Sequence, residues 1–549
     1  MSPTTGFFEF FKPSGGKFPS YQGACALAIL MLVALWAGCA RPTENPLPKN
    51  RLKIGTVHRV KSRNILFDKA LGVFINLSHP HLFALDPDGE IRGLLSDDYR
   101  VSEDFTRWTF RVRDHYFWSD GLPVTASDVT FSVKYVGRHV PSRRWMERSL
   151  VRTEVLDPKT AVLVFDQPRT NMDIEFTSFP IIPRHVWENI PRPRFYSENR
   201  QFIGCGPFII AGMDLNAGVI RLRKNSYWKG PRPALEEVEI HMYHNLDVLS
   251  LALERGDIDT CYKYADTYPY TSAQRLAETG RFTIKKTRTT GLTFIGFNLK
   301  RAPGNQLGFR RAVARALDYR EIQKLITSGY GDPPGAGFVP RGMPYFLELE
   351  KPTRDPGEAE RLLEACGYRD SDGDGIRENA DGKPLKLVLL STPRHHRMSE
   401  LVAEYLGGVG VEVELRIVES ATWVAMKDEY DYHLTITRTT PWGMRMHAGY
   451  GTGYFDARRT GEGVLHTVSD PAFLGICDSL LAVRDPKKKK SLARALQQYY
   501  ARNLPAVALV QRVIVTPTNV RFTGWYHDPL FGIFNLQNFL TVRPAHGIQ

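Results

Sequence analysis

The chain has 549 residues, of which 42% are hydrophobic and 24% charged, a balance typical of folded globular proteins that excludes a wholly disordered chain. Its net charge of +13 comes from scattered Lys and Arg residues without a nucleic-acid-binding motif, which excludes that class of function. Six cysteines in a chain of this length form no disulfide framework. At roughly 150 residues per domain, the length predicts about two to four domains.

Residues 1–39 are predicted to be an export signal. Residues 24–37 form an uncharged apolar run that suits the hydrophobic region of a secretory signal and is short of the roughly 20 residues that span a membrane. The run ends in Leu-Trp-Ala-Gly before Cys39, which resembles a bacterial lipobox and makes Cys39 the predicted lipidation site. An uncleaved anchor helix is the alternative. Both interpretations place the rest of the chain in the periplasm or cell envelope, tethered through a Pro-rich linker at residues 40–50.

Export also bears on the remaining cysteines. Cys205, Cys261, Cys366 and Cys477 would meet an oxidising compartment in a host with a periplasm. Four cysteines allow three pairings, and free buried thiols are the alternative. Because the sequence has no Cys-x-x-Cys pair or Cys/His cluster, it does not predict a structural zinc site.

The segment from residue 51 to about residue 290 is predicted to consist mostly of strands and turns. Residues 109–113 alternate between apolar and polar side chains, and residues 161–165 form a short apolar strand. Asp120-Gly121 and residues 204–207 mark turns.

Helical patterns become clear beyond residue 300. Apolar residues recur at helical spacing over 309–317. Asp355-Pro356 begins a second helix, with an N-cap residue followed by proline at the first helical position, and Gly367 ends it. The basic run at 487–490 follows Asp-Pro in the same way, so it predicts a solvated helix face.

The stretch from residue 385 to Arg438 predicts strands alternating with helices. In chain order the elements are a strand at 385–390, a helix at 398–406, a strand at 411–417, a helix at 421–427 and a strand at 432–438. This β-α-β-α-β order implies parallel strands with right-handed crossovers.

The loop after the last of these strands is the predicted ligand site. In open α/β sheets, ligands bind beyond the carboxyl ends of the strands. Here the strand ends at Arg438, and the following loop carries Trp442, Arg445 and His447, which offer an aromatic platform, a second guanidinium and an imidazole. The alternative is a surface loop whose Trp442 packs into the core.

We expect no catalytic activity and no required cofactor. The sequence contains no HExxH, GxSxG or GxxxxGK[ST] motif. Neither His79/His81 nor His395/His396 has the i, i+4 spacing of a metal-binding pair on a helix. No nucleophile lies in an evident arrangement with a base, so a binding protein is predicted.

One stretch has the spacing of a calcium loop. Asp370, Asp372 and Asp374 occupy positions 1, 3 and 5, Gly375 occupies position 6, and Asp381 occupies position 12, where Glu is usual. Calcium prefers oxygen ligands in this order, so the four aspartates form a candidate calcium site. The alternative is an Asp/Gly-rich turn before the strand at 385.

A series of short motifs keeps a fixed order from about Gly93 to Trp525. Its strongest part is Trp108-Thr-Phe-Arg-Val-Arg-Asp114, followed by Trp118-Ser-Asp-Gly121 and residues 124–129. Further matches lie at 182–185, 203–208, 225–230, 256–259, 296–298, 310–318 and 355–375. Together they resemble the extracellular solute-binding proteins of family 5, the dipeptide, oligopeptide and nickel receptors of ABC importers.

The resemblance implies an α/β protein with the two-lobed periplasmic-binding-protein fold of class II, which has an extra subdomain in lobe I and a hinge between the lobes. It assigns residues 51–295 to lobe I, 296–515 to lobe II and 516–549 to a C-terminal return to lobe I. The lobes would close over a ligand, and an ABC permease and ATPase complex would recognise the closed form.

The resemblance also bears on the ligand. In peptide-binding relatives, an Asp in the loop after the lobe II strand commonly pairs with the amino terminus of the peptide, but here that loop has no acid before Asp456. A basic loop favours carboxylates over ammonium groups. We therefore expect a short peptide or peptide-like ligand, with Arg438 or Arg445 binding a carboxylate and Trp442 stacking on the ligand.

Two alternatives remain. Nickel receptors of the family have a similar loop, which matches Trp442-Gly443 and His447-Ala448, so the resemblance also implies a metal chelate bound through His447. Candidate lobe I partners for the carboxylates of the chelator are Arg138, Arg143 and Arg144. The second alternative, from another class, is a ligand-sensing or scaffold lipoprotein that serves no importer. Neighbouring genes for permeases and ATPases would favour transport.

Overall fold

The computed structural model describes residues 50–85, 91–169, 172–263, 266–350, 353–439, 453–458, 465–483, 485–527 and 532–545. The predicted signal and Cys39 lie outside these ranges. The residues from Asn50 onward form one compact unit. In the ranges described, no helix has the length and apolar character needed to cross a membrane.

A ten-stranded sheet runs through this unit in the order β14-β13-β15-β12-β16-β11-β1-β10-β9-β8. The strands from the predicted lobe I are β1 (Arg51–Thr56), β8 (Phe208–Asp214), β9 (Val219–Lys224), β10 (Glu237–Met242) and β11 (Thr260–Tyr262). Those from the predicted lobe II are β13 (Lys386–Ser391), β14 (Glu412–Ile417) and β15 (Leu434–Arg438). Between the two sets lie β12 (Phe282–Phe297) and β16 (Ala506–Asn519).

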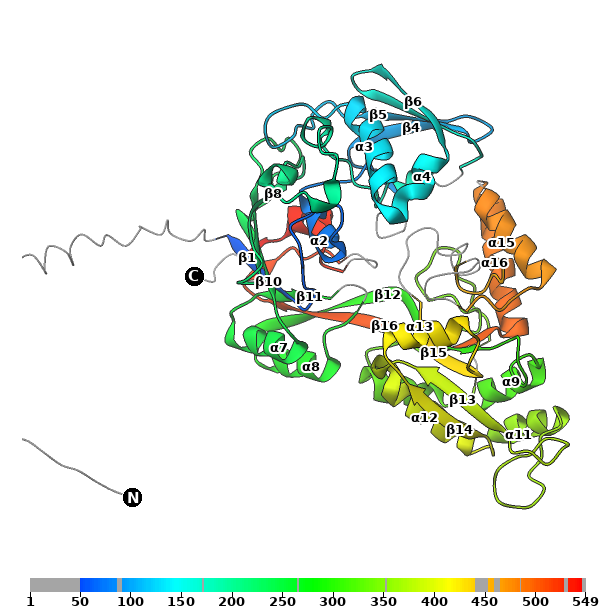
Figure 1. The fold of residues 1–549 in the computed structure, drawn as a ribbon. Coiled ribbons are helices and arrows are strands. Elements are labelled where there is room, and N and C mark those ends of the chain that lie inside the picture. Colours follow the sequence, from blue (N-terminus) through cyan, green and yellow to red (C-terminus); the bar gives the residue numbers. More distant parts are fainter. Residues whose placement is uncertain are drawn as a thin grey trace, which may run out of the picture. The chain divides into compact units, whose positions relative to one another are not determined.

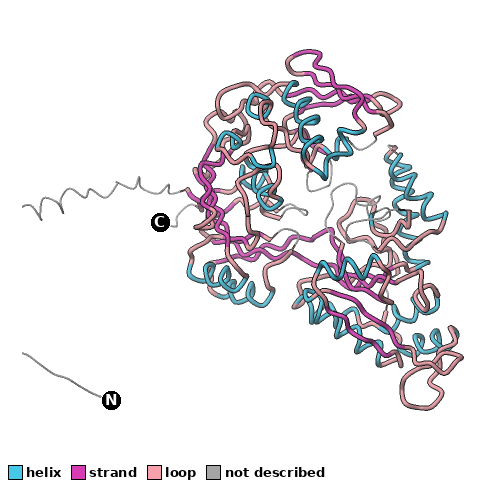
Figure 2. The backbone as a smooth tube through the Cα atoms, in the orientation of Figure 1, coloured by secondary structure: helices cyan, strands magenta, loops and turns pink. Residues whose placement is uncertain are grey.

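The strands β12 and β16 connect the two sets (Figures 1 and 2). They pair antiparallel from Phe282–Asn519 to Gly296–Ala506. At one end β16 also pairs with β11, and at the other end β12 pairs with β15. The lobe boundaries at 295/296 and 515/516 that the sequence analysis assigned both fall inside these strands, because strands of 16 and 14 residues are long enough to serve both lobes.

The predicted β-α-β-α-β unit is confirmed. Helix α12 (His396–Gly407) connects β13 to β14, and α13 (Ser420–Asp428) connects β14 to β15. β13 pairs in parallel with both other strands. It is apolar on both faces: Leu387 and Leu389 pack in one core cluster with Leu401 of α12, while Leu390 packs in another with Trp423 of α13.

The other predicted helices of lobe II are also present. They are α9 (Leu307–Ala316), α11 (Pro356–Ala365) and α16 (Pro486–Asn503), accompanied by α10 (Tyr319–Thr327) and α15 (Pro471–Ala482). The Asp355 carboxylate caps α11 by accepting a hydrogen bond from the Glu358 amide, and Asp485 caps α16 in the same way through Lys488. The basic run at 487–490 is mostly exposed, as expected for a solvated helix face.

Lobe I contains more helix than the sequence analysis expected. Helices α3 (Ala126–His139), α7 (Leu246–Arg255) and α8 (Tyr270–Glu278) lie in a segment predicted to be mostly strands and turns. The first begins with a capping box, in which the Asp128 carboxylate accepts a hydrogen bond from the Thr125 amide. This Thr-x-x-Asp signal was present in the sequence and was missed.

A separate four-stranded antiparallel sheet in lobe I has the order β4-β5-β7-β6. Its strands are β4 (Ser96–Val101), β5 (Arg107–Val112), β6 (Leu150–Asp157) and β7 (Thr160–Phe165), two of which match the predicted strands at 109–113 and 161–165. The remaining short elements are α2 (Lys69–Phe74), α4 (Arg144–Arg148), α5 (Met172–Glu175), α6 (Arg184–Trp187), α17 (Leu536–Thr541), β2 (Phe83–Leu85), β3 (Ile91–Gly93), β17 (Phe522–Thr523) and β18 (Arg543–Pro544).

The four cysteines of the folded part form no disulfide and are present as thiols: Cys205, Cys261, Cys366 and Cys477. All except Cys366 are buried. Burial raises the pKa of the Cys261 thiol to about 12, so this thiol stays protonated and unreactive at neutral pH. Of the two alternatives left open by the sequence, the structure shows thiols without disulfide bonds.

His79 and His81 serve the packing of lobe I. The Nδ1 atom of His79 lies 2.8 Å from Ser78 Oγ, and its Nε2 atom lies 3.1 Å from the Ile203 carbonyl oxygen. The Nδ1 atom of His81 lies 3.0 Å from the Phe179 carbonyl oxygen. Burial lowers the pKa of each imidazole to about 4. Both side chains are therefore neutral in the folded protein at neutral pH.

These two histidines should make the protein sensitive to acid. A histidine in the unfolded chain has a pKa of about 6.5, so below that pH the unfolded state binds protons that the folded state excludes. The free energy of unfolding should fall by about 1.4 kcal/mol per histidine for each pH unit between about 6.5 and 4. Urea unfolding of His81→Gln at pH 7, 6 and 5 should show a smaller fall than the wild type. Ile203→Val, which removes no titratable group, should keep the wild-type pH dependence; an unchanged dependence in His81→Gln would contradict the prediction.

Candidate functional site

A pocket lies where β12, β15 and β16 meet. Its lining residues are Asp266, Thr267, Gly291, Leu292, Thr293, Arg438, Thr439, Arg512, Val513 and Ile514. Thr293 of β12 stands opposite Arg438, the last residue of β15. The pocket is thus at the carboxyl end of a parallel strand, the place where α/β sheets bind ligands.

An irregularity in the sheet borders this pocket. Arg288 of β12 pairs with Val513 of β16, and Leu292 pairs with Gln511, so three residues of β12 stand opposite the single residue Arg512. Such bulges interrupt the ladder and redirect side chains, and they are common beside functional sites. The edge of β12 that faces β15 holds the chain just beyond that strand. The Leu292 amide donates a hydrogen bond to the Thr439 hydroxyl at 2.7 Å, and the Thr439 amide donates one to the Leu292 carbonyl at 2.8 Å.

Asp266 forms ion pairs with three basic side chains beside the pocket. Its carboxylate lies 2.9 Å from Arg512, 3.1 Å from Arg394 and 3.2 Å from Lys263. The Asp266 side chain is 13% exposed. Within the described ranges, none of these three cations forms an ion pair with any other carboxylate. Three positive charges therefore share one negative charge beside the pocket, which leaves two in excess.

The pKa values of the neighbouring groups follow from this arrangement. Burial by itself would raise the pKa of the Asp266 carboxyl, but the surrounding cations outweigh burial and hold that pKa well below its usual range. Burial, with the nearby Arg394 charge, lowers the pKa of the Arg438 guanidinium to about 10, so Arg438 stays charged at neutral pH. Burial and the neighbouring guanidiniums lower the pKa of His395 to about 3, so His395 is neutral.

The structure places one of the four predicted ligand-binding residues, Arg438, on the pocket wall. Trp442, Arg445 and His447 lie outside the described residues. Two of the lobe I arginines considered for a chelator have partners of their own: Arg143 lies 3.3 Å from Glu175, and Arg138 lies 3.6 Å from Glu147.

The cluster around Asp266 was not predicted from the sequence. Arg394 follows the carboxyl end of β13, so the rule that pointed to Arg438 would have found it had it been applied to that strand as well. Lys263 and Asp266 follow β11 in the same manner. Arg512 stands in the middle of an apolar strand, opposite the bulge of β12, so no local pattern in the sequence marks it as a pocket residue.

A second pocket adjoins the first, since Asp266 and Ile514 line both. Its other lining residues are Cys261, Tyr262, Lys263, Tyr268, Val515, Thr516, Gly532 and Ile533. All of them belong to lobe I, to β16 or to the C-terminal return. Asp266 therefore borders both pockets, with Lys263 lining the second pocket and Arg512 lining the first.

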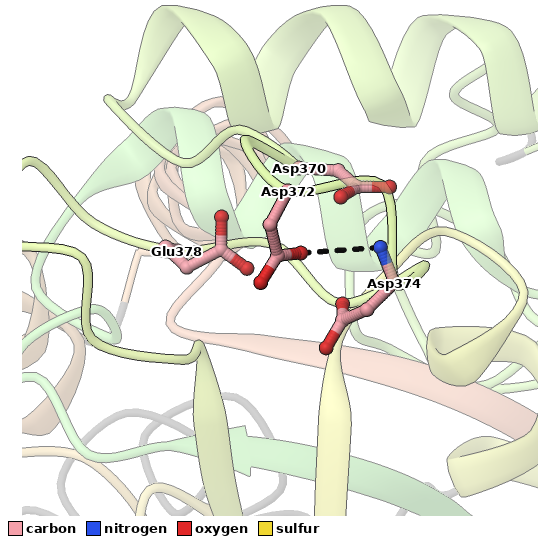
Figure 3. Close-up of side chains that lie close together, drawn as sticks. All are labelled: Asp370, Asp372, Asp374 and Glu378. Atoms are coloured by element: carbon pink, nitrogen blue, oxygen red, sulfur yellow. Dashed lines mark hydrogen bonds between the residues drawn. The ribbon is translucent and has the colours of Figure 1, made fainter.

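The predicted calcium loop groups a different fourth carboxylate from the one that its spacing predicted. Asp370, Asp372, Asp374 and Glu378 each have a carboxylate oxygen within 4.8 Å of the others (Figure 3). Asp381 is not in this group. Glu378 occupies position 9 of the loop, where the chain has already turned back toward the acidic residues, whereas Asp381 lies in the next turn.

Amides of the same loop already bind these carboxylates. Asp370 accepts hydrogen bonds from the Gly373 and Gly375 amides at 2.7 and 3.2 Å, and Glu378 accepts one from the Ser371 amide at 2.8 Å. Gly373 and Gly375 have φ angles of 83° and 88°, which only glycine adopts without strain. The loop is therefore held by its own hydrogen bonds, as an Asp/Gly-rich turn is, and calcium binding stays a prediction.

Substitutions in this loop can show whether Glu378 or Asp381 is the fourth calcium ligand. If the loop binds calcium as its spacing predicts, calcium should raise the unfolding temperature of chelator-treated protein, because a ligand that binds only the folded state stabilises it. Glu378→Gln should abolish that rise, whereas Asp381→Asn should retain it. Calorimetry with and without calcium measures both variants. No rise in the wild type would leave the loop as a turn, and a rise lost only in Asp381→Asn would restore the spacing read from the sequence.

Most of the chain is similar to a known protein family. The family model described as "Bacterial extracellular solute-binding proteins, family 5 Middle" matches residues 90–461, well over half of the chain. The nickel-binding periplasmic protein of Escherichia coli (strain K12) is 25% identical over 374 residues, covering 65% of this chain and 68% of that protein. The glutathione-binding protein GsiB of Salmonella typhi is 22% identical over 469 residues, covering 82% of this chain and 86% of the relative.

Solved structures show the same fold. NikA from Brucella suis, in complex with Fe(III)-EDTA, has a TM-score of 0.79 at 19% identity and covers 90% of this chain and 100% of its own. The periplasmic oligopeptide-binding protein from Thermotoga maritima has a TM-score of 0.78 at 20% identity and covers 90% of this chain and 99% of its own. These likenesses confirm the two-lobed fold that the sequence motifs implied.

Proposed function

Since the chain belongs to the bacterial extracellular solute-binding proteins of family 5, we propose that it binds a short peptide or peptide-like ligand for an ABC importer. Receptors of this kind act outside the cytoplasm. Their lobes close over the ligand, and a permease and ATPase complex then recognises the closed form and transports the ligand. Relatives named as glutathione-binding and dipeptide-binding proteins support a peptide-like ligand.

The observation that carries the proposal is the charge and position of the pocket at the end of β15. Arg438 lines the pocket, and Lys263, Arg394 and Arg512 share the single carboxylate of Asp266 beside it. A site with this excess of positive charge complements a ligand carboxylate, and guanidinium groups bind carboxylates with two parallel hydrogen bonds. The terminal carboxylate of a peptide is such a group.

The membrane anchor is a separate part of the proposal. We propose that Cys39 is lipidated after cleavage of the signal and that residues 40–50 space the folded part from the membrane. The support is the lipobox-like sequence that ends the apolar run at 24–37. Mass spectrometry of the mature amino terminus tests this directly.

Ligand retention should identify the bound molecule. Native mass spectrometry of the exported protein, purified from its own host, should show adducts with peptide masses. The affinity for the peptide so identified should fall about tenfold to a hundredfold in Arg438→Ala, because a hydrogen bond to a charged group contributes about 1.5–3 kcal/mol. Trp442→Ala should also weaken binding without unfolding the protein.

The matched control is Arg416→Ala. Arg416 lies on β14 of the same lobe and pairs with Glu414 and Asp431 away from the pocket, so its loss should leave affinity unchanged. Affinity that is equal in Arg438→Ala and Arg416→Ala would contradict the assignment of Arg438. Unchanged affinity in Trp442→Ala would contradict stacking.

A nickel chelate is the second candidate ligand. The observations that favour it are the similarity to a nickel-binding protein and the charge of the pocket, which suits the carboxylates of a chelator equally well. In that case the native adduct should carry a nickel isotope pattern. A rise in unfolding temperature with nickel and free histidine should then disappear in His447→Ala. A ladder of peptide adducts with no such rise would exclude the metal and remove His447 from the ligand site.

A further inference from the structure

The ion pairs of Asp266 connect parts of the chain that belong to different lobes. Asp266 follows β11 of lobe I. Arg394 lies in the single turn at Pro393–His395 that precedes α12 of lobe II, 128 residues further along the chain. Arg512 lies on β16, one of the two strands that run between the lobes.

Asp266 is fixed to β16 by its neighbour. The Thr267 amide donates a hydrogen bond to the Asp266 carboxylate at 2.9 Å, and the Thr267 hydroxyl accepts one from the Val515 amide at 2.9 Å. The Tyr268 amide donates to the Val515 carbonyl at 3.3 Å. Arg512 is three residues from Val515 on the same strand. The Asp266–Arg512 pair therefore stays together when the lobes move.

The Asp266–Arg394 pair is different, because Arg394 is carried by lobe II. Its side chain is 48% exposed, against 22% for Arg512 and 13% for Asp266. When this pair separates, the Arg394 guanidinium returns to water at little cost, and the Asp266 carboxylate keeps Arg512 and Lys263 as partners. Separation leaves no buried charge without a partner, so the contact is reversible.

We propose that the Asp266–Arg394 ion pair is an interlobe latch that favours the closed arrangement before ligand binds, with Asp266 as a positioning residue that holds Arg394 and Arg512 beside the pocket. This inference rests on the proposed function in one respect, which is that the closed arrangement is the one that holds the ligand. A pair with one half-exposed partner contributes modestly, so the latch shifts the balance between open and closed forms and does not lock it.

The test uses the ligand-free protein, so it does not depend on which ligand is correct. Small-angle X-ray scattering measures opening, and hydrogen exchange measures local protection at residues 266–268 and 393–396. In Arg394→Ala the radius of gyration should increase, and exchange in both segments should rise about five- to tenfold. Arg394→Lys keeps the charge and should behave like the wild type. The control is Arg397→Ala, because Arg397 lies in the first turn of α12, three residues beyond Arg394, and pairs with Glu400.

A second variant removes the same ion pair from its other partner, and so shows whether opening results from loss of the pair or only from loss of the Arg394 side chain. Asp266→Asn should open the protein to the same extent. The double variant Asp266→Asn/Arg394→Ala should open it no further, because the Asp266–Arg394 pair is already lost in either single variant. Scattering and exchange that are the same in the wild type, Arg394→Ala and Arg397→Ala would overturn the latch while leaving the receptor function intact. Conversely, a latch that behaves as expected in a protein that retains no peptide would contradict the proposed ligand alone.

Discussion

The pairing of β12 with β16 is the interaction on which the rest of the structure depends. These two strands hold the lobe I strands at one end of the sheet and the lobe II strands at the other. Their pairing is interrupted twice, by the bulge between Arg288 and Leu292 and by a shift in register between Thr293 and Phe294. Both irregularities lie beside the end of β15, and Arg512, which stands opposite the bulge, lines the pocket.

The positions of β11 and β16 determine which charges gather beside the pocket. The loop after β11 is hydrogen-bonded to β16, which places Asp266 against Arg512 and within reach of Arg394 from the other lobe. Burying the Asp266 carboxylate is costly unless it is paired. Three cations pair with it, which leaves an excess of two positive charges around this carboxylate. The excess makes the site suited to anionic ligands. Burial, together with the neighbouring guanidiniums, lowers the pKa of His395 and keeps its side chain neutral.

Sequence patterns predicted the structure correctly where one short stretch of chain was enough to form the element. The β-α-β-α-β unit and the N-cap at Asp355 depend on patterns within one stretch of chain, and the structure shows both. The calcium loop shows the limit of spacing, because the turn at Gly373 and Gly375 brings Glu378 and not Asp381 to the acidic group. The capping box at Thr125 is visible in the sequence, but the helix that it begins was not predicted because the surrounding pattern favoured strands.

The sequence by itself determined the family, through motifs that keep their order over most of the chain, and it determined one wall of the pocket, because Arg438 ends a strand whose direction the pattern had already established. The tertiary structure alone decided that Asp266, Arg394 and Arg512 meet, since their separations of 128 and 246 residues leave no periodic signal. Hydrophobic periodicity records which face of an element is buried. It does not record which distant charges the fold will bring together, because that depends on strand order and on a bulge that only the assembled sheet contains.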